Sequence, residues 1–160
     1  ARKSRIKPIP TVFLRLFLPQ VPQAMIYIQR IEKFCAAHKL WNEKWDAETN
    51  LEIFGKCSNP NYHGHNFELT VTVKGEIDPE TGFVMNLFEL KKILRKHIID
   101  KVDHKNLNLD VDFMAGILTS SENLAVAIWN ILAPIILEKG ATLHCVRLAE
   151  TDNNVIEYYG

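Results

Sequence analysis

The sequence predicts a single α+β domain, in which two helices cover one face of a four-stranded antiparallel sheet. Its 160 residues are 47% hydrophobic and 24% charged, the composition of one globular domain large enough to bury a core. The hydrophobic periodicity changes along the chain in the order strand, strand, helix, helix, strand, strand. Paired strands before and after two helices are typical of an α+β layer.

Alternating apolar side chains predict the first two strands. Residues 26–34 read IYIQRIEKF and residues 67–73 read FELTVTV, the pattern of half-buried strands. Residues 36–65 form a long polar connection between them, and connections of this length in compact domains are usually functional. The turn signals in residues 75–82, GEIDPETG, end the second strand.

A capping pair and a leucine repeat predict the first helix over residues 86–101. Asn86 has the side chain of a helix N-cap, and Glu89 stands at the third position after it. Apolar residues then recur at helical spacing, at Leu87, Leu90, Leu94 and Ile98.

A second capping pair, Thr119 with Glu122, predicts the start of the next helix. Pro134 is expected to kink or end it, and Gly140 to mark its exit. The apolar positions of this helix share one stripe, at Leu124, Ile128, Leu132 and Ile135.

The C-terminus predicts a hairpin, with strands over residues 142–150 and 155–159 around the polar turn TDNN. An open sheet of four strands leaves unpaired edges, and these favour pairing with other copies of the chain. The pattern therefore predicts a homo-oligomer.

The charge balance and cysteine content indicate which partners and which cellular compartment to expect. Nineteen basic and nineteen acidic side chains lack the basic excess of a protein that binds nucleic acid or an anionic membrane, so neither partner is expected. Three cysteines without framework spacing favour a reducing compartment, the cytoplasm. Residues 1–25 have a basic start and a short apolar stretch broken by Arg15, which we interpret as an N-terminal extension preceding the domain at 26–160.

Three histidines are candidate metal ligands. His63 and His65 are two residues apart, so on an extended chain both imidazoles leave the same face. Antiparallel pairing of the first two strands would bring His38 beside them. Three histidines with an open fourth position are typical of a catalytic zinc, whereas Cys57 as a fourth ligand would close a structural zinc site. Spacing alone leaves both possibilities open.

Six ordered motifs resemble the 6-pyruvoyl tetrahydropterin synthase family, over residues 34 to 160. They are FCAAHKL, FGKCSNPNYHGHN, GEIDPETGFVMNLFELK, VDHKNL, SSENLAVAIW and ETDNN. The resemblance implies the tunnelling fold, in which subunits join their sheets into a trimeric barrel and two trimers stack as a hexamer. It also implies a lyase of tetrahydrobiopterin biosynthesis, which converts 7,8-dihydroneopterin triphosphate to 6-pyruvoyl tetrahydropterin and releases triphosphate.

The resemblance further implies roles for individual residues. A Zn²⁺ cofactor would be held by His38, His63 and His65. Cys57 matches the catalytic cysteine of the family, and Asp103 and His104 match the pair that works with it. Glu150 matches the pterin anchor of the family, and a carboxylate suits that role because it can accept two parallel hydrogen bonds from the ring. A segment matching the lining of the pterin pocket comprises Ser120, Ser121 and Glu122.

Without the resemblance, several of these residues have simpler interpretations. Asp103 and His104 could form a turn or cap, and Glu150 could be an exposed strand residue. Ser120, Ser121 and Glu122 could serve only as a helix cap. Cys35 has the opposite strand parity to His38, and Cys145 is expected to be a small buried hydrophobe.

Two other functions compete with this interpretation. One is 6-carboxytetrahydropterin synthase, an enzyme of the same fold, in which three residues usually separate the cysteine from the His-x-His pair. Here five residues, 58–62, lie between Cys57 and His63, which favours the pyruvoyl product. The other is a non-enzymatic, zinc-stabilised binding module in which Cys57 is coordinated.

The family commonly has serine at the position of Cys35 and glycine or a small residue at that of Tyr62, so packing near the metal could differ.

Overall fold

The computed structural model describes residues 25–160, which form one sheet and the helices that pack on it. Apart from Met25, the N-terminal extension expected over residues 1–25 lies outside the described residues. The sheet has the order β3-β1-β2-β4-β5. Its strands are β1 (Ile26–His38), β2 (His63–Gly75), β3 (Lys105–Asn106), β4 (Thr142–Ala149) and β5 (Val155–Tyr158).

The α+β class predicted from the sequence is confirmed, with one strand more than expected. β1, β2, β4 and β5 form the antiparallel ladder, and the hairpin of β4 and β5 lies at the C-terminus as predicted. The fifth strand, β3, is two residues long and pairs in parallel with Ala36 and Ala37 of β1. Two residues are too few for a periodic signal, so the sequence did not reveal it.

β1 and β2 are both 13 residues long and extend beyond the predicted strands. Their register runs from Ile26 opposite Gly75 to His38 opposite His63. Along the end of β1, Phe34, Ala36 and His38 are buried while Cys35 between them is exposed, so the alternation continues through the histidine. The ladder therefore brings the first histidine beside the other two.

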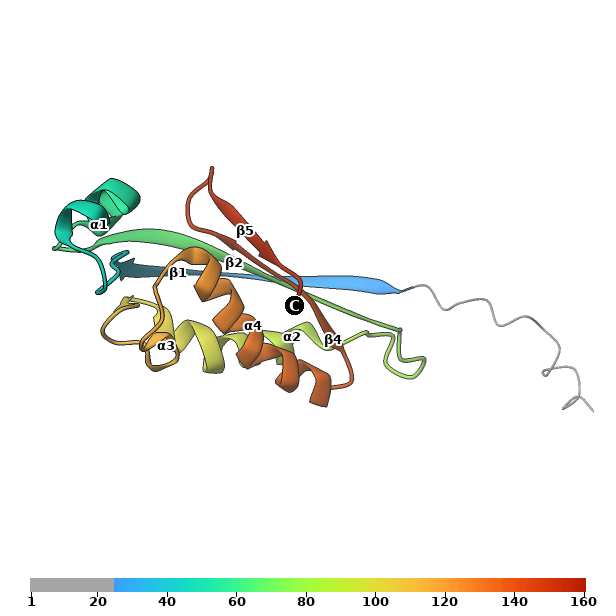
Figure 1. The fold of residues 1–160 in the computed structure, drawn as a ribbon. Coiled ribbons are helices and arrows are strands. Elements are labelled where there is room, and N and C mark those ends of the chain that lie inside the picture. Colours follow the sequence, from blue (N-terminus) through green and yellow to red (C-terminus); the bar gives the residue numbers. More distant parts are fainter. Residues whose placement is uncertain (1–24) are drawn as a thin grey trace, which may run out of the picture.

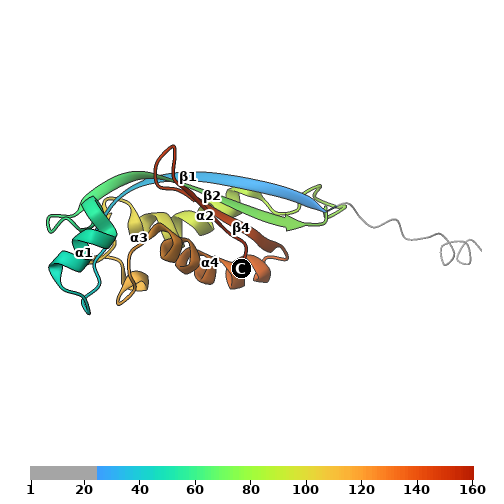
Figure 2. The ribbon, with the colours of Figure 1, turned by 45° about the horizontal axis from the view of Figure 1, so that its top comes forward.

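The hydrophobic core lies between the sheet and two helical segments on one of its faces (Figures 1 and 2). This core includes fully buried side chains of β2, such as Leu69 and Val71, and of α4 (Ser121–Glu138), such as Leu124 and Ile128. Burial of each such side chain contributes about 1.5 to 3 kcal/mol. By length and composition alone α4 could cross a membrane, but its buried face belongs to the core of this domain.

The predicted helix over residues 86–101 is one helical segment in three parts. α2 (Leu87–Leu94) continues through a π-helical turn, η3 (Arg95–Ile99), into α3 (Asp100–Val102). Asn86 is its N-cap as predicted and accepts a hydrogen bond of 2.8 Å from the amide of Phe88. The segment ends directly before Asp103 and His104, so its length places that pair.

A buried carboxylate joins this helical segment to β1. Glu32 is only 5% exposed, and its oxygens lie 2.7 Å from Arg30 and 2.9 Å from Arg95. Pairing of this kind compensates the cost of burying the charge.

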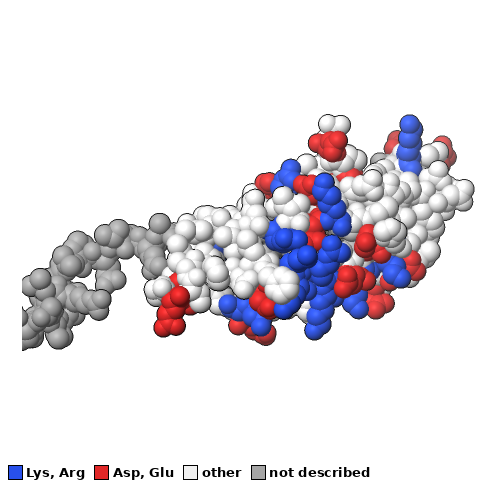
Figure 3. All heavy atoms as spheres, turned by 180° about the vertical axis from the view of Figure 1, so that it is seen from behind, with Lys and Arg blue, Asp and Glu red and all other residues white. Residues whose placement is uncertain are grey.

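In Figure 3, Lys and Arg side chains gather across the middle of the face shown, with acidic side chains beside them, while one end of that face is largely uncharged.

The long connection between β1 and β2 contains a helix that was not predicted from the sequence pattern. α1 (Ala47–Phe54) starts at Asp46, whose side chain accepts a hydrogen bond of 2.8 Å from the amide of Thr49. Its two turns are too short for a clear apolar stripe, and Leu51 and Ile53 on it are exposed. A 3-10 turn, η2 (Gly55–Ser58), follows and carries Cys57.

The predicted start of α4 is wrong by one residue. Ser120, not Thr119, is the N-cap, and its hydroxyl accepts a hydrogen bond of 3.3 Å from the amide of Asn123. Thr119 makes other contacts, described below. Pro134 does not end the helix, which continues to Glu138. Gly140 marks the exit as expected, with a φ of 82° that favours glycine.

Candidate active site

Three histidines meet where β1 ends and β2 begins. His38 is the last residue of β1 and lies opposite His63 in the register, while His65 is two residues further along the same face of β2. One ring nitrogen of each lies within 4.8 Å of the others. Within residues 25–160 this group contains the three histidines and not Cys57, so the convergence predicted from the strand pairing is confirmed.

The ring nitrogens are prepared to bind a cation. Burial lowers the pKa of all three histidines, so the neutral imidazole that a metal requires is favoured. Nδ1 of His38 lies 2.7 Å from the carbonyl oxygen of Thr119, and because a carbonyl only accepts, Nδ1 carries the proton. Nε2 of His38 then carries no proton, and its lone pair is free to bind a metal. Buried ring nitrogens without a hydrogen-bond partner are His38 Nε2, His63 Nδ1 and Nε2, and His65 Nε2.

These observations fit a metal centre. Buried polar atoms in proteins nearly always have partners, so four unpartnered nitrogens in one cluster need an explanation. Three neutral imidazoles form a donor set that suits zinc and leaves a coordination position open. The arrangement can therefore hold a metal ion that also contacts a small molecule.

A strained residue precedes the second histidine. Tyr62 has a φ of 64°, in the left-handed region that glycine adopts without strain. Its ring lies 5.2 Å from the ammonium of Lys39, the residue after His38. The cation-π contact joins the residue after His38 to the residue before His63, next to the ends of β1 and β2.

Cys57 lies beside the triad without joining it. Its carbonyl accepts a hydrogen bond of 2.9 Å from the amide of Leu40, two residues after His38, so η2 is tied to the end of β1. The thiol is half-buried and free. Of the other cysteines, Cys35 is exposed on the face of β1 opposite to buried His38, as its parity predicted, and Cys145 is buried as predicted.

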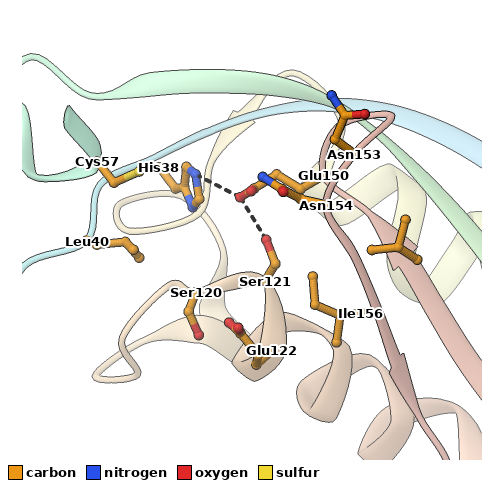
Figure 4. Close-up of a pocket in the computed structure, with 11 residues that line it drawn as sticks. His38, Leu40, Cys57, Ser120, Ser121, Glu122, Glu150, Asn153, Asn154 and Ile156 are labelled. Carbon is orange, nitrogen blue, oxygen red and sulfur yellow. Dashed lines mark hydrogen bonds and ion pairs between the residues drawn. The ribbon is translucent and has the colours of Figure 1, made fainter. Parts of the chain in front are cut away.

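Glu150 approaches the triad from the end of β4. Its Oε1 lies 3.6 Å from Nε2 of His38 and 3.8 Å from Nε2 of His65, and it accepts a hydrogen bond of 2.8 Å from the hydroxyl of Ser121. Figure 4 shows Glu150 between His38 and Ser121. A carboxylate in this position can receive N–H groups of a ligand that also reaches the metal.

A hollow of about 430 Å³ connects these groups (Figure 4). It brings together Cys57, His38, Glu150 and the start of α4, which are among the residues that the family resemblance assigns to one site. It is lined by His38, Leu40, Cys57, Ser120, Ser121, Glu122, Glu150, Asn153, Asn154, Val155 and Ile156. The last four come from the turn and second strand of the β4–β5 hairpin, and none of them was among the site residues predicted from the sequence.

The comparisons with known proteins agree with this geometry. The sequence model described as 6-pyruvoyl tetrahydropterin synthase matches residues 27–160. The chain belongs to the 6-pyruvoyl tetrahydropterin synthase family. It is 47% identical over 133 residues to 6-pyruvoyl tetrahydrobiopterin synthase of Pongo abelii and 46% identical over 133 residues to that of Homo sapiens. Each alignment covers 83% of this chain and 90% of the relative.

A solved structure of the family has the same fold. The structure of Caenorhabditis elegans 6-pyruvoyl tetrahydropterin synthase superposes with a TM-score of 0.80 at 38% identity. The superposition covers 86% of this chain and 97% of that one. The agreement extends over nearly all the residues that the structure describes, including the elements that carry the histidines.

In this member of the 6-pyruvoyl tetrahydropterin synthase family, Asp103 and His104 do not line the hollow. Asp103 accepts hydrogen bonds from the amide of Cys35 at 2.9 Å and from Nδ1 of His104 at 3.0 Å, and the first of these is the main cause of its lowered pKa. The amide of His104 donates to the carbonyl of Cys35 at 2.7 Å. The His104 side chain is 83% exposed, so the pair is held firmly but faces outward.

Proposed function

We propose that the protein is a zinc-dependent lyase that converts 7,8-dihydroneopterin triphosphate to 6-pyruvoyl tetrahydropterin and releases triphosphate, a step of tetrahydrobiopterin biosynthesis. One observation carries the proposal most directly. A triad of unpartnered histidines adjoins a hollow whose wall contains both a free thiol and a carboxylate. Family membership supplies the chemistry that this arrangement would serve.

The metal would be held by His38, His63 and His65. When bound, zinc would polarise the hydroxyl oxygens of the substrate side chain and lower the cost of removing protons from the neighbouring carbons. Thr119 holds His38 in the tautomer that points its lone pair toward the other two rings. The three rings thus need no proton loss before they bind the ion.

Cys57 is proposed as the base that takes a proton from a side-chain carbon. It lines the hollow next to His38, and it stands outside the group of ligand atoms that lie within 4.8 Å of one another. Both observations favour a base over a fourth ligand. Asp103 would orient the ring of His104 through their contact of 3.0 Å, and His104 would pass protons on.

Glu150 is proposed as the anchor of the pterin ring. Ser121 donates to Oε1 and so fixes the carboxylate, which can accept hydrogen bonds from the amide-like edge and the amino group of the ring. Ser120 and Glu122, from the same end of α4, line the hollow and would complete the wall of the ring site. No Lys or Arg is among the residues that line the hollow within the described chain, so the triphosphate is expected to extend beyond it.

The assembly is proposed to be a hexamer of two trimers in the cytoplasm. β3 covers β1 only at Ala36 and Ala37, so the outer edge of β1 before them has no pairing strand among residues 25–160. β5 forms the opposite edge of the sheet. Two open edges on a twisted sheet suit closure into a barrel with other copies.

Assembly would also explain the position of His104. Its exposed ring is not among the residues that line the hollow of its own subunit, so we infer that its proposed role belongs to the site of a second copy. Each active site would then combine Cys57 of one subunit with His104 of another.

Product identification tests the proposed function. The zinc-loaded protein is incubated with 7,8-dihydroneopterin triphosphate, and the products are identified by mass together with released triphosphate. The proposal expects the 6-pyruvoyl product. The 6-carboxy product would favour the related enzyme despite the spacing of Cys57 and His63, and a folded, zinc-loaded protein without turnover would favour a binding module.

A further inference from the structure

We propose that Thr119 is a positioning residue of the metal centre, which orients His38 through its main-chain carbonyl and holds that carbonyl in place through its hydroxyl. The inference rests on the proposed function, because it takes His38 to be a metal ligand. It assigns a role to a residue that the sequence pattern had indicated as a helix cap. It extends to Asn108, which holds the same segment from the other side.

The first link is the contact between His38 and Thr119. Nδ1 of His38 donates to the carbonyl of Thr119 at 2.7 Å, and Thr119 is 2% exposed. A buried carbonyl at this distance fixes both the tautomer and the rotation of the ring. Nε2, the other ring nitrogen of His38, has no hydrogen-bond partner and is left free for a metal.

The second link is the Thr119 hydroxyl. Oγ1 lies 3.0 Å from the carbonyl oxygen of Lys39 and 3.2 Å from Oδ1 of Asn108. Both are acceptors, so the single hydroxyl proton binds one of them at a time. Thr119 thereby contacts His38 with its main chain and the next residue with its side chain. It clamps the end of β1 from two directions.

The third link is Asn108, which extends the sheet by one residue. The amide of Lys39 donates to Oδ1 of Asn108 at 2.8 Å, and Nδ2 of Asn108 donates back to the carbonyl of Lys39 at 2.9 Å. Two such bonds reproduce the pairing that a backbone partner would offer. The β1–β3 pairing ends at Ala37, so the Asn108 side chain continues it past His38. The metal ligand therefore lies within a fixed segment rather than at a fraying strand end.

Three consecutive residues at the start of α4 each make a different contact. Thr119 holds His38, Ser120 caps the helix, and Ser121 holds Glu150. Because the cap is made by Ser120, the side chain of Thr119 is free for the metal centre. The N-terminal end of α4 thus sets the separation between His38, a proposed metal ligand, and Glu150, the proposed pterin anchor. Since Ser120 and Ser121 make the other two contacts, the positioning of His38 falls to Thr119.

The test uses the binding of Co²⁺, whose visible spectrum reports ligand geometry. Thr119→Val removes the hydroxyl but keeps the volume and the carbonyl, and Thr119→Ser restores the hydroxyl. Asn108→Ala removes the second clamp at an exposed position where loss of folding is not expected. Asn86→Ala is the matched control, because it removes the cap of α2 and lowers stability away from the histidines.

We expect Thr119→Val and Asn108→Ala to weaken Co²⁺ affinity, measured against a competing chelator, by about tenfold. Their visible spectra should also change, whereas Thr119→Ser and Asn86→Ala should keep the affinity and spectrum of the wild type. Wild-type affinity and spectrum in folded Thr119→Val would overturn the inference. If Thr119→Val does not fold, Asn108→Ala decides in the same way. Failure of the wild type itself to bind Co²⁺ would instead contradict the proposed metal centre.

Discussion

Oε1 of Glu150 lies 3.6 Å from Nε2 of His38. Both atoms are hydrogen-bond acceptors, because the ring proton of His38 is on Nδ1, where it meets the carbonyl of Thr119. Two acceptors this close favour a cation or a donor group of a ligand between or beside them. The proposed pterin anchor and the metal triad are therefore close enough for the charge of the Glu150 carboxylate to interact with a cation held by the histidines.

Glu150→Gln should weaken pterin binding without removing the metal. The substitution replaces a charged acceptor by an amide that turns an N–H toward the donors of the ring. Hydrogen bonds to charged groups contribute about 1.5 to 3 kcal/mol each, so affinity should fall roughly 10- to 150-fold. Titration with a pterin, together with metal analysis of the same sample, measures both effects. Unchanged affinity would refute the anchor, and loss of metal would make Glu150 a ligand.

His63→Ala should abolish stoichiometric zinc binding. His63 has two buried, unpartnered ring nitrogens and lies opposite His38 in the strand register. Its removal leaves two protein ligands where an open catalytic site needs three. Metal analysis after dialysis gives the result. His97→Ala, a half-buried histidine of η3 outside the triad, is the control and should keep one zinc per subunit. Full zinc content in His63→Ala would show that the ligand assignment is wrong.

The metal-free protein should lose stability as the pH falls below about 6.5. Burial lowers the pKa of His38, His63 and His65 from the ordinary value of 6.5, so the unfolded chain takes up protons before the folded one does. When the unfolded state binds more protons, the free energy of unfolding decreases with falling pH. This loss continues until the pH reaches the lowered values of the folded state.

Chemical denaturation at about pH 7.5 and about pH 5.5 measures this dependence. His63→Ala should show a shallower loss, because one buried imidazole is absent. Stability that is constant or rises toward pH 5.5 in the metal-free wild type would contradict the lowered pKa values.

Much of this site was predictable because its residues are positioned by regular strands. The parity of His63 and His65 and the pairing of β1 with β2 bring the triad together from sequence spacing alone. Contacts between distant segments were not predictable in the same way. The bonds of Thr119 to His38 and Lys39 depend on how the loop before α4 returns to the end of β1, and no local pattern encodes that path. The same holds for Asn108.

His104→Ala should lose turnover but keep its zinc, and mixing should show whether the site is shared. His104 lies outside the hollow that Cys57 lines. If each site takes these residues from different subunits, hybrid oligomers of Cys57→Ala and His104→Ala contain some sites with both residues intact. Random mixing should restore about a quarter of the wild-type activity. Verified hybrids without activity would place both residues in one subunit or remove one of them from catalysis.

Cys57→Ala should keep zinc and assembly yet lose elimination of triphosphate. The three histidines already supply the protein ligands of an open catalytic site, and Cys57 lies outside their group of converging atoms. Loss of a general base typically lowers turnover by about 100- to 10,000-fold. If Cys57 were instead a fourth ligand, the same substitution should remove zinc and destabilise the fold, because structural zinc binding is coupled to folding.

Turnover alone does not separate these two roles of Cys57, since both predict an inactive variant. Zinc content, oligomeric state and turnover are therefore measured on one sample, with Cys35→Ala as the matched control at an exposed thiol on the other face of β1. A zinc-loaded, assembled and inactive Cys57→Ala supports the base. A zinc-free, unstable protein supports the structural ligand. A zinc-loaded and active one assigns proton removal to another group, and the half-buried thiol beside His38 would then serve only to pack the wall of the hollow.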